Sequence, residues 1–566
     1  MPEQTLIDPV IERAYHDPEH TTLIMLDQDG GETRVTAGQF HQQASEYALA
    51  LQQAGVGPED LVILVLKHSR VLLSAFWGAL YLGAIPSIFP FLTEKLDPDL
   101  YMQRVRSLVI SEGAKAVITF PEFKPALSDL LAEADCLVLS TEDVPDGEGD
   151  VSQSDGHFWQ NPDAGKIAFL QHSSGTTGLQ KGVALSHRAV LNQISAYRRA
   201  IDLNDRDVVV SWLPLYHDMG LIAGFVMPIV SGTPLVLMSP FHWVRDPKAL
   251  LWAIDRHKGT LCWLPNFAYN HMARTARPAA LKGLDLSSLR AAINCSEPVY
   301  HQSHQVILER LKPYGLSDNM LSVSYAMAEN TFAVTQTRIG QPPTVDWIMI
   351  GALQEDGRAV PVEEEAEGAV AMVSCGLPIE GTEIAIAAED GTRLKERLVG
   401  EIVLRSDCML TEYYRRPGIT AEAIRDGWYY TGDMGYLANG ELYITGRKKD
   451  LIIVGGKNIY PQDLEAIANH VRGIYPGRAV AFGLFDERIG SEVVVMVAEL
   501  QPDLDSRTPL EIERDLRQQV VAQTEVTLAD VRLVEERWVI KTSSGKIGRA
   551  DNRDKYLRQF RHQEQG

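Results

Sequence analysis

The segment Ser173-Ser-Gly-Thr-Thr-Gly-Leu-Gln-Lys-Gly182 follows directly on the apolar run Ile167-Ala-Phe-Leu170. Its glycines let backbone N–H groups turn toward an anion, its hydroxyls add hydrogen-bond donors, and Lys181 adds positive charge. It is not a Walker A loop, because that motif's second glycine and the hydroxyl residue after its lysine are both missing. Taken alone, such a turn is more often a flexible loop than a polyphosphate site, so the surrounding sequence has to decide between them.

Short apolar runs recur on both sides of this segment, with helical patterns between them. They include Leu61–Leu66, Ala116–Phe120, Val208–Trp212 and Leu235–Met238. Strands that alternate with helices predict parallel sheets covered on both faces, with ligands at the carboxyl ends of the strands. From about residue 357 the runs become shorter and are punctuated by Gly and Asp, which predicts a β-rich subdomain.

A domain boundary is predicted at Gly446-Arg-Lys-Lys-Asp450, after which the pattern is that of a compact α+β unit. The predicted fold class is therefore α/β. A large N-terminal domain, residues 1–446, would hold two parallel-sheet βα subdomains and the β-rich subdomain at about 357–446. Residues 447–566 would form a small C-terminal domain.

Composition excludes several classes of protein. The 566 residues are 45% hydrophobic and 23% charged, as in ordinary soluble globular proteins. The net charge of −22 has the wrong sign for neutralising nucleic-acid phosphates, so no nucleic-acid partner is expected. Five cysteines without a C-x-x-C pair argue against a disulfide framework or a zinc site and fit a reducing compartment. Because the first residues show no basic segment followed by an apolar run, we expect a cytoplasmic protein.

Two uncharged stretches, Val71–Thr93 and Met219–Val244, are each long enough to cross a bilayer. Gly83 and Pro86 divide the first stretch into a helix-length and a strand-length piece. Gly232 divides the second stretch in the same way. We therefore expect a buried helix followed by a strand at each place, and no transmembrane segment.

Further motifs follow the first segment in order. They are Leu213-Pro-Leu-Tyr-His-Asp-Met-Gly220, Tyr325-Ala-Met-Ala-Glu329, Tyr430-Thr-Gly-Asp433, Gly446-Arg-Lys-Lys-Asp450, Gly455-Gly-Lys-Asn-Ile-Tyr-Pro461 and Ser543-Ser-Gly-Lys546. The series resembles the adenylate-forming superfamily of acyl-CoA synthetases, nonribosomal-peptide adenylation domains, luciferases and fatty acyl-AMP ligases. The resemblance implies that a carboxylate attacks the α-phosphorus of MgATP to give an acyl-adenylate and pyrophosphate. Such chemistry depends on positioning and charge neutralisation.

The resemblance also implies an ATP site drawn from several segments. In chain order it comprises Ser174, Gly175, Thr176, Thr177, Gly178, Lys181, Ser296, Glu297, Pro298, Tyr325, Ala326, Asp433 and Arg447. The first six would cradle the β- and γ-phosphates, and the next three would pack along adenine. Asp433 would accept hydrogen bonds from the ribose hydroxyls, and the planar fork of Arg447 suits ribose or phosphate. Outside this series of motifs, Asp433 and Arg447 would each be interpreted as a surface charge.

Three residues are predicted to be catalytic by the same resemblance. Lys546, on a Ser/Gly loop, would reach the α-phosphate and the substrate carboxylate. His217 would orient that carboxylate. Glu329 would bind Mg²⁺, a hard cation that prefers oxygen ligands. In isolation, a histidine is usually structural, a lysine near a C-terminus is usually solvated, and Glu329 would be a carboxylate at a helix N-terminus.

The uncharged run after Asp218 would supply an apolar wall for the acid. The candidates for this acyl pocket are Trp212, Met219, Ile222 and Phe225. The same run can equally be plain core. The C-terminal domain is expected to be mobile, because the family rotates it before the acyl group passes to a thiol, and Lys449 matches the hinge position.

Several segments resemble the fatty acyl-AMP ligase branch in particular. They are Ser211–Ile222, Ser296–Val299, Val373–Gly376 and Tyr460–Asp463. The residues from Arg338 to Gly368 leave room for the inserted element by which that branch disfavours CoA. The sequence thus favours a medium- or long-chain fatty acid as substrate and the phosphopantetheine thiol of an acyl carrier protein as acceptor.

Other features of the sequence do not decide between a carrier protein and CoA as the thiol acceptor. Gln180, Ala326 and Ala328 depart from common family residues, and Gly455-Gly456 resembles the small residues of CoA-using synthetases. A fatty acyl-CoA ligase is therefore the alternative. A non-catalytic adenylate-binding scaffold is a further alternative, although such a scaffold would not need Lys546 together with the other family residues. A third alternative, a luciferase-like oxygenase, has no distinguishing residue in this sequence.

Charge is unevenly distributed along the chain. From Arg447 onward, 19 basic and 19 acidic side chains balance, so residues 1–446 carry the whole net charge of −22. Residues 541–566 hold seven basic and three acidic side chains. Because carrier proteins are commonly acidic, the basic C-terminal tail, including Arg549 to Arg561, and the Arg and Lys residues around the hinge are candidates for docking one. A plain solvated C-terminal helix is the alternative.

Overall fold

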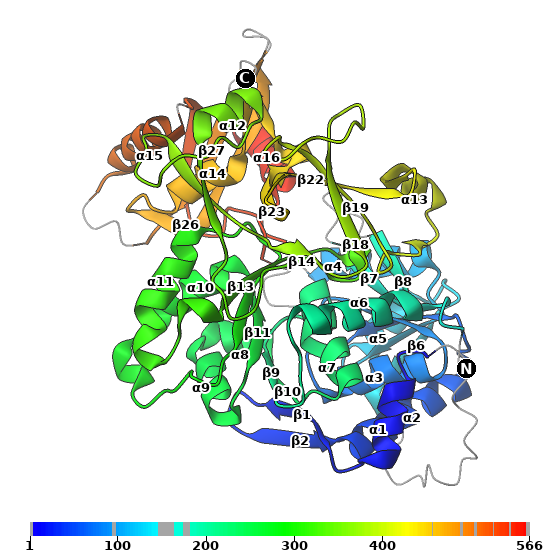
Figure 1. Cartoon of the computed structure of the whole chain (residues 1–566). Coiled ribbons are helices and arrows are strands. Elements are labelled where there is room, and N and C mark those ends of the chain that lie inside the picture. The colour runs from blue at the N-terminus through cyan, green and yellow to red at the C-terminus, as the bar shows by residue number, and fades with distance from the viewer. Residues whose placement is uncertain are drawn as a thin grey trace.

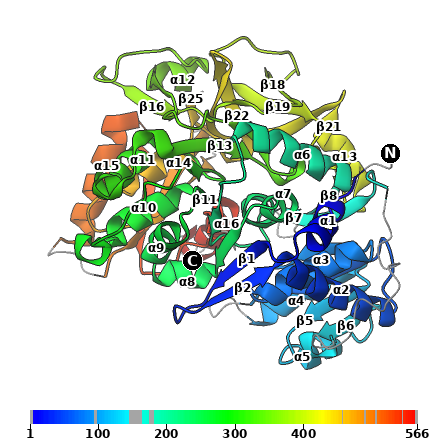
Figure 2. The same cartoon turned by 60° about the horizontal axis from the view of Figure 1, so that its bottom comes forward.

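The computed structural model describes residues 4–92, 98–144, 163–173, 181–454, 457–486, 491–502, 507–524, 526–542 and 545–561. Two large sheets occupy the lower part of Figure 1, and the C-terminal elements lie at the top. Figure 2 shows that helices cover these sheets on both sides, as alternating strands and helices require.

The first large sheet contains the strand that leads into the Gly/Ser/Thr segment. Its order is β20 (Glu412–Tyr413), β8 (Lys181–Ser186), β7 (Ile167–Ser173), β4 (Ile85–Ile88), β3 (Leu61–Val65), β5 (Ala116–Thr119) and β6 (Leu137–Ser140). The strands from β7 to β6 are parallel, whereas β8 and β20 pair antiparallel. Almost every residue of the central strands is buried, which explains their continuous apolar sequence.

The second large sheet carries most of the candidate site. Its order is β17 (Leu377–Pro378), β14 (Ala333–Gln336), β13 (Leu321–Ala326), β12 (Ala291–Asn294), β11 (Leu261–Leu264), β9 (Val209–Ser211), β10 (Leu235–Met238), β1 (Thr21–Leu26) and β2 (Glu32–Thr36). The strands from β13 to β1 run parallel, and antiparallel strands close both edges.

Helices follow the strands of both sheets. They are α1 (Asp8–His16), α2 (Ala37–Gln53), α3 (Arg70–Tyr81), α4 (Pro98–Glu112), α5 (Lys124–Leu130), α6 (His187–Ala200), α7 (Met227–Ser231), α8 (Pro240–Arg245), α9 (Lys248–His257), α10 (Asn266–Thr275), α11 (His301–Leu311) and α13 (Pro417–Ala423). The close approach of α2 and α3 depends on Gly78, where a Cβ would lie 2.6 Å from the Ala44 carbonyl oxygen.

A β-rich unit follows the second sheet. It joins β18 (Thr382–Ala387), β19 (Gly400–Ser406), β22 (Trp428–Ala438), β21 (Ile424–Arg425) and β23 (Glu441–Arg447). Beside it lies a smaller two-stranded antiparallel sheet of β15 (Val345–Met349) and β16 (Ala369–Val373). The helix α12 (Ile350–Asp356) lies between these strands in the sequence.

The C-terminal unit has its own apolar core. Its strands are β24 (Ile452–Val454), β25 (Lys457–Ile459), β26 (Ile474–Asp486), β27 (Ser491–Leu500) and β28 (Leu528–Val534), and its helices are α14 (Pro461–Ala468), α15 (Pro509–Thr524) and α16 (Arg549–Tyr556). In Figure 1 these helices lie around β26 and β27. The α/β fold class, with a large N-terminal part of parallel sheets and a smaller C-terminal part, is thereby confirmed. The exact domain boundaries at 446 and 357 stay predictions.

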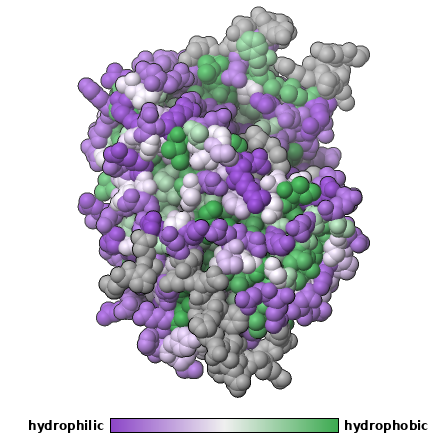
Figure 3. All heavy atoms as spheres, turned by 90° about the vertical axis from the view of Figure 1, so that its right-hand side faces the viewer, coloured by the Kyte–Doolittle hydropathy of each residue, from purple (hydrophilic) through white to green (hydrophobic). Residues whose placement is uncertain are grey.

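Both uncharged stretches fold as a helix followed by a strand, as predicted. The first forms α3 and then β4, and the second forms a π-helical segment, Met219–Val226, then α7 and β10. No helix among the described residues is long and apolar enough to span a membrane. On the face drawn in Figure 3, hydrophobic side chains gather in patches that hydrophilic ones separate.

Candidate active site

The end of strand β13 meets the hairpin of β22 and β23. Asp433 and Arg447 are paired residues of that hairpin, and Arg447 Nε lies 3.2 Å from Asp433 Oδ1. The buried Tyr325 donates a 2.7 Å hydrogen bond from its hydroxyl to Asp433 Oδ2. The Asp433 carboxylate raises the pKa of Arg447 more than burial lowers it. Both carboxylate oxygens of Asp433 are held in place, which suits an acceptor for ribose hydroxyls.

Strand β12 leads into the segment predicted to contact adenine. Ser296 has a φ of 71°, a left-handed conformation that costs a residue with a side chain about 1–3 kcal/mol. The backbone N–H of Phe267, at the start of α10, donates a 2.9 Å hydrogen bond to Glu297 Oε2. Pro298 is exposed. The strained turn therefore ends the strand abruptly and lets Glu297 cap the neighbouring helix.

Glu329 lies in a short 3-10 turn directly after β13. The Tyr413 hydroxyl donates a 2.8 Å hydrogen bond to Glu329 Oε1, and Lys181 Nζ lies 5.1 Å from the centre of the Tyr413 ring. These three residues meet because β20 pairs with β8 and thus adds Tyr413 to the first sheet. Burial raises the pKa of Glu329, and the Tyr413 hydroxyl opposes this rise.

His217 and Asp218 lie at the start of the π-helical segment. Asp218 Oδ1 contacts His217 Nδ1 and accepts a 2.8 Å hydrogen bond from the backbone N–H of Met219. Burial favours a high pKa for Asp218, but His217 and Lys546 outweigh it and lower the pKa below its ordinary value. Asp218 thus fixes the imidazole and caps the helical segment.

Lys546 reaches this region from the C-terminal unit. Its backbone N–H donates to Thr542 Oγ1 at 3.2 Å, and its carbonyl accepts from the Thr542 N–H at 2.7 Å, so Lys546 is tied to Thr542. Burial and the positive charge of Arg447 lower the pKa of Lys546, and the Asp218 and Glu297 carboxylates oppose that shift. The fold therefore brings the predicted catalytic lysine to residues at the ends of the second sheet.

Some predicted residues cannot be placed in this way. Ser174, Gly175, Thr176, Thr177 and Gly178 lie outside the described residues.

Ala326 and Lys449, predicted for the ATP site and the hinge, both lie among the described residues. Ala326 is the last residue of β13, next to Tyr325. Lys449 lies in a 3-10 turn, Lys448–Asp450, where burial lowers its pKa. Its assignment as the hinge stays a prediction.

The four candidates for the acyl wall are all buried. Trp212 stacks on Trp243 with ring centres 3.7 Å apart. Met219 and Ile222 lie in the π-helical segment with Phe225, whose ring packs 5.6 Å from that of Phe76 in α3. Phe225 thus joins the core shared with α3, whereas Trp212 belongs to an aromatic group near the start of α10. Their role as an acyl pocket stays a prediction.

The sequence predictions omit two residues that the structure brings into the site. Asp218 directly follows His217 in a quoted motif, so its position was a usable signal. Tyr413 lies between motifs, in the pair Tyr413-Tyr414, and only the pairing of β20 with β8 brings it to Glu329.

The family model for AMP-binding enzymes matches residues 10–414. The chain belongs to this family. JamA of Moorena producens, a medium-chain fatty acid:acyl-carrier-protein ligase, is 30% identical over 578 residues, which cover 98% of this chain and 95% of JamA. FadD32 of Mycolicibacterium smegmatis, a long-chain fatty acid:AMP ligase, is 31% identical over 583 residues, which cover 94% of this chain and 90% of FadD32.

A solved structure from a study of fatty acyl-adenylate ligases from E. coli and L. pneumophila has a TM-score of 0.89 and 26% identity to this AMP-binding enzyme. The alignment covers 100% of this chain and 98% of that one. The predicted resemblance and the predicted enzyme class, an AMP-forming acid ligase that uses ATP, are thereby confirmed.

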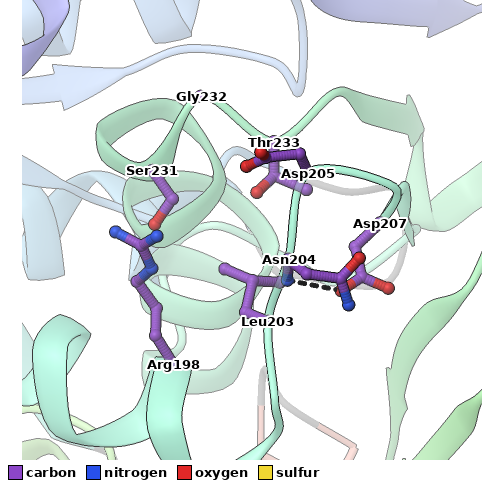
Figure 4. A pocket seen from close by; sticks show the side chains of 8 residues that line it. All are labelled: Arg198, Leu203, Asn204, Asp205, Asp207, Ser231, Gly232 and Thr233. Atoms are coloured by element: carbon purple, nitrogen blue, oxygen red, sulfur yellow. Dashed lines mark hydrogen bonds between the residues drawn. The ribbon is translucent and has the colours of Figure 1, made fainter.

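Two cavities of this AMP-binding enzyme lie outside the candidate site. One has a volume of about 20 Å³, room for no more than a water molecule. Figure 4 shows its lining side chains, from Arg198 to Thr233. The other, about 310 Å³, lies between α8 and α10 and is lined by Arg245, Lys248 and Arg277 among others. Neither lining includes a predicted ATP-site residue.

Proposed function

We propose that this AMP-binding enzyme activates a medium- or long-chain fatty acid with MgATP to acyl-AMP and pyrophosphate. It then transfers the acyl group to the phosphopantetheine thiol of an acyl carrier protein. The observation that carries this proposal is the linked group of Asp433, Arg447 and Tyr325 at the end of β13, and the opposing effects of Asp218 and Glu297 on the pKa of Lys546 support it. The relative JamA supports a fatty acid as substrate and a carrier protein as acceptor, and the relative FadD32 supports a fatty acid and the formation of acyl-AMP.

The residues divide the work of adenylation between binding and charge neutralisation. Asp433, fixed by Tyr325 and Arg447, would accept hydrogen bonds from the ribose hydroxyls. Lys181 would neutralise the β- and γ-phosphates. Lys546 would place its ammonium against the α-phosphate and the attacking carboxylate, where negative charge is brought together in the transition state.

Glu329 fits a magnesium ion. Among the described residues, no group of three or more His, Cys, Asp or Glu side chains is arranged to hold a metal by itself. Glu329 is a carboxylate whose pKa is raised by burial and also by the negative charges of Asp218 and Asp433, so a cation there would relieve repulsion. Mg²⁺ bound to Glu329 would take further oxygen ligands from phosphate and water and would neutralise the leaving pyrophosphate.

His217 would orient the substrate carboxylate. Its ring is fixed by Asp218, and the π-helical segment that follows is buried and apolar. The acyl chain, which leads away from the carboxylate, would therefore lie in an apolar environment formed by Met219, Ile222 and Phe225. Trp212 would contribute from the end of β9.

The inserted element supports a carrier protein rather than CoA. The Asp346 carboxylate in β15 accepts a 2.8 Å hydrogen bond from the Tyr436 hydroxyl and pairs with Arg397. At the other side of the element, Glu355 in α12 lies 2.8 Å from Lys457 in β25, and Figure 2 shows α12 beside β25. The element therefore contacts both the β-rich unit and the C-terminal unit, and at that junction it would disfavour CoA, as the resemblance implies.

The proposed docking surface is narrower than the sequence indicates. The sequence predicts docking by the basic residues from Arg549 to Arg561, but Arg549 is only 19% exposed and pairs with two acidic side chains. The Lys555 ammonium donates to the Trp538 carbonyl at 2.7 Å. Arg553 and Arg558 are exposed and are the better candidates for an acidic carrier protein. A cytoplasmic location remains part of the proposal.

Acid-dependent ATP–pyrophosphate exchange tests the first half-reaction. A panel of fatty acids is offered to the purified enzyme, and mass spectrometry then identifies the product formed with CoA or with a holo-carrier protein. Exchange with fatty acids and thioester on the carrier protein are the expected results. Acyl-CoA as the main product would assign the chain to the acyl-CoA ligases, and no exchange with any acid would favour the scaffold alternative.

A further inference from the structure

The guanidinium of Arg549 joins two distant acidic residues of the C-terminal unit. Its Nη1 atom donates to Asp450 Oδ2 at 2.7 Å, and its Nε and Nη2 atoms donate to the two carboxylate oxygens of Glu465 at 2.8 and 2.6 Å. The three side chains are 19%, 16% and 7% exposed. Two-pronged ion pairs of this kind, shielded from water, fix geometry more firmly than surface pairs do.

The three residues belong to segments with different tasks. Asp450 directly follows Lys449, the proposed hinge. Glu465 lies in α14 and also accepts a 3.1 Å hydrogen bond from the backbone N–H of Ala481 in β26, a long strand of the sheet of this unit. Arg549 is the first residue of α16, three residues after Lys546. One guanidinium therefore connects the hinge segment, the body of the unit and the loop with the catalytic lysine.

The loop itself is tied to α16. Asn552, fully buried, accepts a 2.8 Å hydrogen bond from the Ile540 N–H and donates to the carbonyls of Ile540 and Gly548. Lys541 and Ile547 form an antiparallel bridge at the base of the loop. Lys546 thus keeps a fixed position relative to α16, and Arg549, at the start of α16, ties that helix to Asp450 beside the proposed hinge.

Other charged groups surround this pair of contacts. Asp463 on α14 lies beside Glu465, while Arg447 and Lys449 approach from the hinge side. From the N-terminal part, the Tyr300 hydroxyl reaches the Gln462 carbonyl at 3.3 Å. Arg549 therefore lies where the C-terminal unit meets the rest of the molecule. Its positive charge is balanced by the carboxylates of Asp450 and Glu465 rather than by solvent.

We infer that Arg549 is a positioning residue for adenylation: by bridging Asp450 and Glu465 it holds the Lys546 loop at a fixed distance from the hinge, so that rotation of the C-terminal unit delivers Lys546 to Asp218 and Glu297. The inference rests on the proposed function. It assigns Arg549 no contact with ATP or acid.

The central test compares Arg549→Met with Arg514→Met, which removes an exposed arginine from helix α15 of the same unit. In Arg549→Met we expect kcat of acid-dependent pyrophosphate exchange to fall by about 100-fold, as for a small displacement of a catalytic group, with KM for ATP near the wild-type value. Acyl transfer from supplied acyl-adenylate should fall much less, because it does not require Lys546. Equal losses in both half-reactions, or unchanged exchange, would overturn the inference.

Two conservative variants separate positioning from folding. Asp450→Asn keeps the Arg549–Glu465 pair, so the unit should retain its melting temperature while exchange slows. Arg549→Lys keeps one charge-assisted contact and should recover part of the exchange lost in Arg549→Met. A slow Asp450→Asn variant whose melting temperature has also collapsed would instead indicate a purely structural role.

Hydrogen exchange provides a readout that does not require activity. In Arg549→Met, the amides of Thr542 and Lys546, both hydrogen-bonded within the loop, should exchange faster than in the wild type and in Arg514→Met. Unchanged exchange there would reject the inference whether or not the enzyme adenylates fatty acids. If the wild type shows no acid-dependent activity but the loop amides respond as expected, the proposed function fails and the positioning role stands.

Discussion

The two sides of the candidate site are built in different ways. Asp433, Arg447 and Tyr325 are held by sheet register and by direct contacts with one another. Lys546 lies in a loop, and the ion pairing of Arg549 at the start of α16 connects that region to Asp450 and Glu465. The groups proposed to bind the nucleotide are thus preorganised on strands, whereas the lysine proposed to promote the chemistry is attached to a separate unit.

This difference has a mechanistic consequence. Binding residues on strands can be ready before the substrates arrive, which lowers the entropy cost of orienting ATP. A lysine on a separate unit can be withdrawn after adenylation, which leaves space for an incoming thiol at the same adenylate. Changes on the strand side should therefore affect nucleotide binding, and changes on the loop side should affect the rate of the first half-reaction.

Replacement of Lys546 should have the largest effect. Lys546→Ala removes the cation that is proposed to face the α-phosphate, and losses of about 1000-fold in kcat are typical when one such electrostatic contact is removed. Pyrophosphate exchange measures the rate, and circular dichroism with thermal melting checks the fold. Exchange near the wild-type rate would mean that the approach of Lys546 to Asp218 is incidental.

Asp433→Asn should have the next largest effect, and a different kinetic signature. The substitution weakens the charge-assisted bond to Arg447 and the one proposed to the ribose, each worth about 1.5–3 kcal/mol, so KM for ATP should rise by roughly 10- to 100-fold. Tyr325→Phe, which removes a single hydrogen bond to Asp433, should raise it less. A fall in kcat with KM unchanged in both variants would contradict the division of labour between the two sides.

Lys449→Pro tests whether the two sides move relative to each other. Lys449 already lies in a 3-10 turn, whose φ is close to the value that proline imposes, so the arrangement with Lys546 in place should survive. Rotation requires that dihedral to change, so thioester formation should slow while pyrophosphate exchange stays close to the wild type. Lys449→Ala, which leaves the backbone free, is the matched control. Equal slowing of both half-reactions by the proline would argue against this hinge.

The sequence predicts the strand side of the site better than its supports. Tyr325 and Glu329 stand in a motif at the end of a parallel strand, and parallel strands bring their carboxyl ends to one edge. Asp433 and Arg447 stand in two further motifs, and the register of the antiparallel hairpin of β22 and β23 pairs them. Tyr413 cannot be predicted in this way, because its contact with Glu329 depends on a two-residue strand that joins the first sheet from far along the chain.

The contacts of Arg549 near Lys546 also cannot be predicted from the sequence. The motif predicts the lysine, and the basic character of residues 541–566 suggests a solvated surface. Arg549 nevertheless turns inward, because Asp450 and Glu465 lie 99 and 84 residues away in sequence but adjacent in space. Pairings between single charges at such separations leave no periodic pattern, so charge counting assigns Arg549 to the wrong environment.

The smallest expected effect is a shift in the pH profile after removal of one hydroxyl. Tyr413→Phe deletes the hydrogen bond that stabilises ionised Glu329 against burial, so the pKa of Glu329 should rise further. Only the ionised carboxylate can bind Mg²⁺, and ionisation is lost as the pH falls through that pKa. The acidic limb of the kcat/KM profile should therefore move to higher pH, by up to about one unit, while the plateau at alkaline pH changes little.

Magnesium titration at two pH values separates this effect from a loss of packing. Near neutral pH the variant should need more Mg²⁺ than the wild type for half-maximal exchange, and at higher pH the two requirements should converge, because Glu329 is then ionised in both. Tyr414→Phe, which leaves the hydroxyl at 413 in place, is the control. If the acidic limb of Tyr413→Phe coincides with that of the control, Glu329 does not govern the pH dependence, and the contact with Tyr413 serves only to pack the two sheets together.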